Sequence, residues 1–175
     1  MTLIRRRTTL IQGDHHARNR ARGRRGTPRP VLGKIFGGHG FDVALIARSK
    51  ERLGELTEKL AAEGVTAAGF PPDVTDRAAL AAALDSTAGR FGGIDVLHYY
   101  SPGAGITETL RSTGALDVTV DNLRPQIESI CYAAITATRA VLPAMLAVGA
   151  GTLLYTTGAS HEVGMSKPAD LRRRL

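Results

Sequence analysis

"FDVALIARSKERL" (41–53) joins two different patterns within thirteen residues. Its first half contains the run DVALIA (42–47), which is largely apolar and of strand length, and it is bounded by Gly40 before it and by Arg48-Ser49 after it. Its second half opens the segment 49–64, in which Leu53, Leu56 and Leu60 recur at helical spacing. The stretch therefore predicts a buried strand over 42–47 that leads directly into an amphipathic helix, which Gly64 ends.

The same alternation continues along the chain. Further strands are predicted over 65–70, 94–100 and 152–157, with helices over 73–93 and 119–151. Strands that are apolar throughout indicate a sheet covered on both faces, and therefore a parallel one. The predicted fold class is α/β, with a doubly wound parallel sheet. Ligands bind at the carboxyl ends of the strands in such sheets, so the site residues are expected there.

Composition is that of an ordinary globular protein, but charge is concentrated at the two ends. The 175 residues are 43% hydrophobic and 22% charged, with a net charge of +7. Residues 1–35 carry ten basic side chains against Asp14 alone. The single cysteine, Cys131, suits a reducing compartment, so a cytoplasmic location is expected. No uninterrupted apolar window of membrane-spanning length is seen, and neither a membrane partner nor a metal site is expected.

Several segments resemble the short-chain dehydrogenase/reductase family. They are FDVALIARSKERL (41–53), PDVTDRAAL (72–80), RFGGIDVL (90–97), TATRAVLPAML (136–146) and GTLLYTTGAS (151–160). The resemblance spans roughly residues 36–160, and it is specific because the segments occur together in the family's order. It implies a Rossmann-like fold and hydride transfer between a nicotinamide cofactor and a small carbonyl or alcohol substrate.

The resemblance also implies cofactor-binding residues. Arg48 and Ser49 follow the strand beside which the adenosine ribose lies. A guanidinium there can pair with a 2′-phosphate, and no acid occupies that turn, so NADP is expected, with NAD possible. Asp73 is the family's partner for the adenine amino group, followed by Val74, although an aspartate here could equally cap a helix. Gly33 is included among these residues because the sequence resembles the family again from about this position onward.

The chain departs from the family where proton transfer is carried out. Ser160 is the best candidate for the serine that polarises the substrate carbonyl, and Thr157 is the second. The family's base is a Tyr with a Lys four residues later, yet no Tyr follows Ser160, and Lys167 precedes Pro168. His161 is a conceivable donor. Further departures are YYSPGAG (99–105) in place of the family's NNAG, and Ile130 at the position of a structural Asn.

The arginine-rich stretch ARNRARGRRGTPRP (17–30) stands where the first strand and the phosphate-binding glycine turn are expected. Arg and Gly codons moved forward by one base become GNN codons, which encode Val, Ala, Asp, Glu or Gly. Residues 16–26 read in that frame permit an apolar strand, which makes a shifted frame the leading interpretation. A disordered basic arm that binds nucleic acid and a plain solvated tail are the alternatives.

These observations give three segments: a basic segment over 1–32, a partial Rossmann-like domain over 33–160 and a tail over 161–175. We expect an incomplete sheet that lacks its first strand and its C-terminal elements, and consequently low stability. We expect an NADP-dependent oxidoreductase that is inactive as the chain stands. A non-catalytic dinucleotide-binding or oligomerisation remnant is the alternative, with a homo-oligomer formed through the long helix; nucleic-acid binding is a less favoured one.

Overall fold

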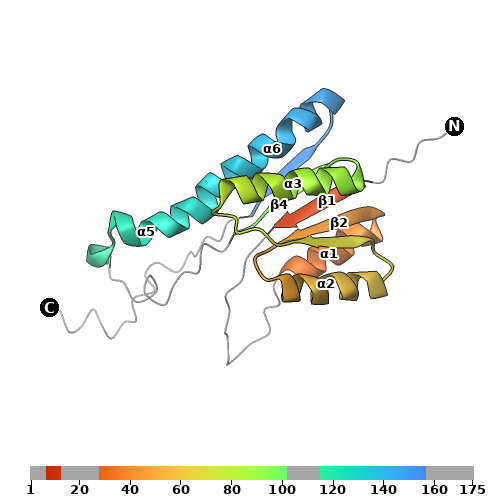
Figure 1. The fold of residues 1–175 in the computed structure, drawn as a ribbon, viewed down its shortest axis with the longest axis horizontal. Coiled ribbons are helices and arrows are strands. Elements are labelled where there is room, and N and C mark those ends of the chain that lie inside the picture. The colour runs from red at the N-terminus through yellow and green to blue at the C-terminus, as the bar shows by residue number, and fades with distance from the viewer. Residues whose placement is uncertain (1–6, 13–27, 102–114, 157–175) are drawn as a thin grey trace.

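A five-stranded parallel sheet forms the centre of the molecule (Figure 1). The computed structural model describes residues 7–12, 28–101 and 115–156. The strands lie in the order β3-β2-β1-β4-β5, and every neighbouring pair is parallel. Their bounds are β1 Arg7–Gln12, β2 Phe41–Ile46, β3 Ala67–Phe70, β4 Val96–Tyr99 and β5 Thr152–Tyr155. This arrangement confirms the predicted α/β class with a doubly wound parallel sheet.

The prediction that the chain lacks its first strand is wrong. β1, with the sequence RTTLIQ, fills the central position: it pairs with β2 along all six residues and with β4 along four. Residues 7–12 therefore belong to the Rossmann-like domain and not to the basic segment assigned to 1–32. We expected low stability because the sheet was predicted to lack its central strand. Since β1 occupies that position, this reason for low stability no longer applies. Two threonines and an isoleucine suit a strand, although three arginines directly before them hide the pattern.

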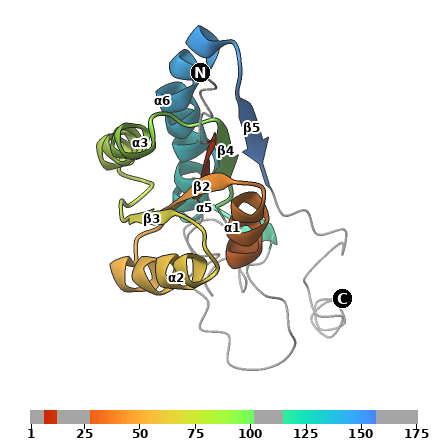
Figure 2. The same cartoon turned by 90° about the vertical axis from the view of Figure 1, so that its right-hand side faces the viewer.

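Helices cover both faces of this sheet (Figures 1 and 2). Helices α1 (Pro28–Gly38) and α2 (Lys50–Ala62) lie on one face, where they pack over Val43, Leu45 and Ala47. Helix α3 (Arg77–Phe91) and the long C-terminal helix lie on the other face. The core there includes side chains from β2, β4 and both helices: Ala44, Ile46, Leu80, Leu84, Leu97, Ala137 and Val141. Alternate residues of β2 thus face opposite layers, as its apolar run predicts.

The ends of α2 and α3 follow the capping signals in the sequence. The Ser49 side chain caps α2 by accepting a hydrogen bond from the Arg52 N–H at 3.2 Å. Gly64 follows α2 with a φ of +78°, a left-handed conformation that glycine adopts without steric cost. Asp76 caps α3 by accepting a bond from the Ala79 N–H at 3.0 Å. These caps fix where each helix leaves the carboxyl end of the preceding strand.

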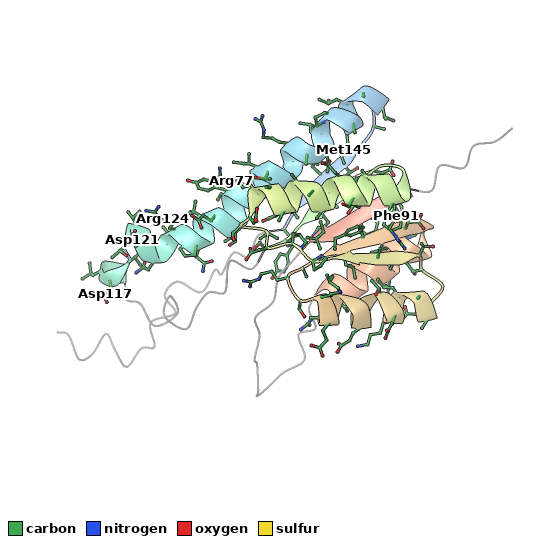
Figure 3. All side chains as sticks on the ribbon, in the orientation of Figure 1. Arg77, Phe91, Asp117, Asp121, Arg124 and Met145 are labelled. Carbon is green, nitrogen blue, oxygen red and sulfur yellow. The ribbon has the colours of Figure 1, made fainter. Side chains whose placement is uncertain are left out.

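The long helix is continuous from Val120 to Val148 but is not uniform. It consists of α5 (Val120–Ile127), a π-helical turn η2 (Glu128–Tyr132) and α6 (Ala133–Val148), and a short 3₁₀ turn η1 (Ala115–Asp117) precedes it. Pro125 lies inside α5, three residues before η2. In Figure 1, α5 extends past the edge of the sheet. Figure 3 shows the exposed Asp121–Arg124 pair on this part, where the charged atoms are 3.4 Å apart.

By length and composition alone, the helix over 120–148 could cross a membrane, with a mean hydropathy of 1.5 in its most apolar window. This window has a high mean hydropathy but is not an uninterrupted apolar run, so the expectation stated for uninterrupted windows is not contradicted. The side of α6 that carries Ala133, Ala137, Val141 and Met145 is buried in the core against α3 and β4. Core helices of globular proteins pass the same composition test, so this feature is weak evidence for a membrane span.

Replacing Leu84 by Ala should destabilise the protein by about 2–5 kcal/mol, because the leucine lies in the core between α3 and α6. The matched control is Leu116→Ala: Leu116 is 96% exposed, and its truncation should change the free energy of unfolding by less than about 0.5 kcal/mol. Urea denaturation followed by circular dichroism measures both. Equal losses in the two variants would contradict the described core.

Candidate cofactor site

Two charged residues meet at the carboxyl edge of the sheet. Arg48 follows β2 and Asp73 follows β3, and these strands are direct neighbours, with Ile46 opposite Phe70. Both side chains are exposed. The positive charge of Arg48 acts on the Asp73 carboxylate and favours its ionised form. The structure thus brings together the two residues that the family resemblance assigned to different parts of one cofactor.

Asp73 is held in place by the residue two positions later. Its Oδ1 accepts a hydrogen bond from the Thr75 N–H at 2.9 Å and another from the Thr75 hydroxyl at 2.7 Å. This is a local turn in which a side chain replaces a backbone acceptor. The alternative that Asp73 caps the helix is wrong, because Asp76 caps α3. Sequence reasoning missed Thr75 as a supporting residue, although an Asp-x-Thr spacing is a usable signal for such a turn.

The electrostatics of Asp73 combine opposing effects. Partial burial is the largest single effect and raises the pKa of its carboxyl. The two hydrogen bonds from Thr75 and the charge of Arg48 act the other way, and together they hold the pKa below its ordinary value of 3.8. The carboxylate is therefore an ionised, oriented acceptor near neutral pH, which is the state that a hydrogen bond from an amino group requires.

Of the other predicted cofactor-binding residues, two hold the backbone at this edge of the sheet in place. The Ser49 hydroxyl is engaged in capping α2. Val74 is 4% exposed and belongs to the larger core, so it fixes the loop that carries Asp73. Gly33 is not brought together with them: it lies more than one turn inside α1, where an added Cβ would be 3.2 Å from the Leu60 methyl carbons. Gly33 thus permits close packing of α1 on α2.

A second set of polar contacts, which was not predicted from the sequence, lies at the ends of β4 and β5. The buried Tyr99 hydroxyl donates to the Ser129 carbonyl within η2, so β4 is tied to the irregular turn of the long helix. His98 Nε2 lies 2.8 Å from the Thr156 hydroxyl, and burial lowers the pKa of the imidazole. Ile130, at the position of the family's structural Asn, lies within η2 and is 36% exposed.

A cation–π contact joins α3 to the same turn. The Arg77 guanidinium carbon lies 5.6 Å from the centre of the Tyr132 ring, and Figure 3 shows Arg77 where α3 begins beside the long helix. The remaining candidates lie outside the described residues: Gly103, Gly105, Thr157, Ser160, His161 and Lys167. Among the described residues, no three His, Cys, Asp or Glu side chains are grouped so that they could hold a metal ion.

Comparison with known proteins agrees with this architecture. A family model described as short chain dehydrogenase matches residues 32–167, which is most of the chain. The chain belongs to the short chain dehydrogenase family. A fatty acyl-CoA reductase of Mycobacterium tuberculosis is 36% identical over 64 residues, covering 37% of this chain and 22% of that protein. The match therefore covers less than a quarter of that relative's length.

Solved structures share the fold at lower identity. A metagenomic short-chain oxidoreductase in complex with NADP is 19% identical, with a TM-score of 0.71, over 91% of this chain and 66% of that one. A short-chain type dehydrogenase/reductase from Mycobacterium marinum is 22% identical, with a TM-score of 0.71, over 92% and 59%. Actinorhodin polyketide ketoreductase with NADPH is 19% identical, with a TM-score of 0.69, over 93% and 57%. This family member spans between about half and two thirds of their lengths.

Removing the Thr75 hydroxyl should raise the pKa of Asp73 towards its ordinary value, because Thr75→Val deletes one of the two bonds to Oδ1 and keeps the side chain's shape. Carboxyl-carbon NMR titration measures the change. Since the folded pKa is depressed, the stabilisation from Asp73 is present above the unfolded pKa and is lost as the pH falls through the folded pKa. Thr66→Val, at an exposed threonine away from Asp73, is the control. An unchanged Asp73 titration in Thr75→Val would rule out the described turn.

Proposed function

We propose that the protein binds NADP(H) across the carboxyl edge of the sheet, with Arg48 at the 2′-phosphate and Asp73 at the adenine amino group. The observation that carries this proposal is the placement of Arg48 and Asp73 on neighbouring strand ends, with the carboxylate ionised and oriented by Thr75. Ligands of open α/β sheets bind at this edge. The similar oxidoreductase with NADP and the ketoreductase with NADPH are in accord with it.

The charge around β2's end supports NADP over NAD. Arg48 is followed by Ser49 and Lys50, so the first three residues of this turn carry two cations and no acid. A guanidinium and an ammonium suit a phosphate dianion, whereas an acidic side chain would suit a 2′-hydroxyl. The N-terminus of α2 adds the positive end of a helix dipole, which also favours a phosphate. Ser49 contributes by fixing this terminus.

Within this proposal each residue has a separate task. Arg48 neutralises and orients the phosphate, while Asp73 accepts a hydrogen bond from the adenine and excludes bases that lack an amino donor at that position. The bound cofactor supplies the hydride. Val74, which is buried, and the Asp73–Thr75 turn keep the adenine end rigid, so less conformational entropy is lost when the cofactor binds.

Arg48→Ala should weaken NADPH binding about tenfold and leave NADH binding nearly unchanged, because it removes one charge-assisted phosphate contact. Isothermal titration with both cofactors measures the difference. The matched control is Arg90→Ala, at the last turn of α3, where the guanidinium lies over the Phe91 ring and away from this edge. Equal NADPH affinity in Arg48→Ala and Arg90→Ala would remove Arg48 from the site.

For the reaction, we propose the family's chemistry, hydride transfer between NADP(H) and a carbonyl or alcohol substrate, and we propose that these 175 residues do not complete it. Reduction of a ketone produces an alkoxide that must receive a proton. Residues 156–175 contain no tyrosine to supply it, and Ser160 has no Tyr–Lys partner to assist it. A positioned acid contributes a factor of about 10²–10⁴ to such a step. Gly33, which was predicted to bind the cofactor, lies inside α1 and has no role in the proposed cofactor site.

No carbonyl reductase activity above background is therefore expected from these residues. NADPH oxidation with a panel of ketones, aldehydes and quinones measures it, and NADPH binding in the same preparation shows that the cofactor site is intact. Turnover that survives Ser160→Ala but is lost in His161→Gln would contradict this expectation and would assign proton donation to His161.

Two further aspects of the function are proposals as well. Exposed apolar side chains on the long helix, among them Ile135 at 57% and Leu146 at 70% exposure, support a homo-oligomer formed through this element. A cytoplasmic location accords with a single cysteine, Cys131, which is exposed and free. The basic stretch 17–30 falls largely outside the described residues, and no observation on the described ones favours nucleic-acid binding.

A further inference from the structure

A cavity of about 320 Å³ lies between α1 and α2, away from the proposed cofactor site. Its floor is Leu45 of β2, and Leu56 and Leu60 of α2 form its apolar wall. The exposed residues of its lining, which form its mouth, are Lys34, Lys59, Ala62 and Glu63. The volume is at the lower end of the range typical of small-molecule sites, and the lining is apolar with a few charged groups at one side. The cavity thus has the form of a site for a small amphiphile.

The charges at this mouth do not cancel. Lys34 of α1 forms an ion pair with Glu63, which directly follows α2, and both side chains remain nearly half exposed, at 48% and 42%. Lys59 forms no ion pair with any residue in the described part of the chain. One positive charge therefore remains above an apolar floor. A ligand that complements this arrangement has one negative group and an aliphatic body.

We propose that this cavity binds a medium-chain aliphatic monocarboxylate. The carboxylate pairs with Lys59 at the mouth, and the hydrocarbon chain covers Leu45, Leu56 and Leu60. Burial of the chain is favourable because it removes apolar surface from water on both partners. Lys59 would repel a ligand with a cationic head group. The second negative charge of a dianionic head group would be repelled by the Glu63 carboxylate.

The site is distinct from the proposed cofactor site. Arg48 and Ser49 precede the first residue of α2, whereas the cavity is lined by its second half, from Leu56 onward. A helix of 13 residues is about 20 Å long, so the two sites lie near opposite ends of it. Figures 1 and 2 show α1 and α2 side by side beneath the sheet, the layer in which this cavity lies.

Octanoate binding to the full chain tests the proposal. Titration followed by calorimetry should show saturable binding, and the methyl resonances of Leu45, Leu56 and Leu60 should shift in the same concentration range. Lys59→Met should weaken octanoate binding about fivefold, which is the effect of losing one exposed ionic contact. Arg52→Met removes a cation from the first turn of the same helix, outside the cavity, and should leave binding unchanged.

A second pair of variants tests the cavity itself. Ala62→Leu adds an isopropyl group at the mouth and should abolish octanoate binding, whereas Ala61→Leu, at the adjacent exposed position outside the lining, should not. Both alanines are exposed, so neither change disturbs the core, and a thermal melt checks that the two variants fold equally.

Four results would overturn the proposal. They are an absence of octanoate binding, equal affinity for octanoate and 1-octanol, equal binding by the Ala62→Leu and Ala61→Leu variants, and competition between octanoate and NADP. Competition would place octanoate at the cofactor edge. Failure of NADPH to bind would count against Arg48 and Asp73 only, since the cavity's residues are separate from theirs.

Discussion

The backbone ladder on both sides of β1 is the interaction on which the rest of the molecule depends. β1 joins the pair β2–β3 to the pair β4–β5, and within the described sheet no other strand connects these halves. The N–H and C=O groups of β1 form hydrogen bonds with both neighbouring strands. Each of these groups left unpaired at the centre of a covered sheet would cost about 1–3 kcal/mol of stability. The relative position of α2's terminus and the long helix follows from this connection.

That constraint also explains why the proposed cofactor residues meet. Parallel strands in register end at the same edge, so residues from separate parts of the chain come off adjacent strands. The local capping groups then set their direction: Ser49 turns the chain into α2, and Asp76 turns it into α3 three residues after Asp73. The site is therefore a by-product of sheet register, refined by short side-chain-to-backbone bonds. On the other side of β1, the Tyr99–Ser129 bond gives the long helix a comparable anchor.

Local patterns in the sequence were enough to predict much of this. The strand at 42–47, the helix that follows it, the glycine that ends this helix and the placement of Arg48 and Asp73 after neighbouring strands all follow from residue type and spacing. β1 could not be predicted in this way, because a four-residue β-type pattern next to arginines carries little local signal. Tyr99–Ser129 and His98–Thr156 join residues distant in sequence, and the packing of the whole domain decides such buried polar pairs. Gly33 was counted among the cofactor-binding residues because the similarity to the family resumes there, whereas its proximity to Leu60 exists only once α1 and α2 are packed.

The position of β1 has a consequence for the order of folding. Its pairing with β2 closes a shorter stretch of chain than its pairing with β4, where Thr9 meets Val96 across three intervening helices and two strands. Closing a longer loop costs more chain entropy, and non-local pairing slows folding. During synthesis the β1–α1–β2–α2–β3 half can therefore assemble while the second edge of β1 still awaits a partner. For that interval the nascent chain carries an open central strand, a state that exposes it to wrong pairing with another chain before β4 arrives.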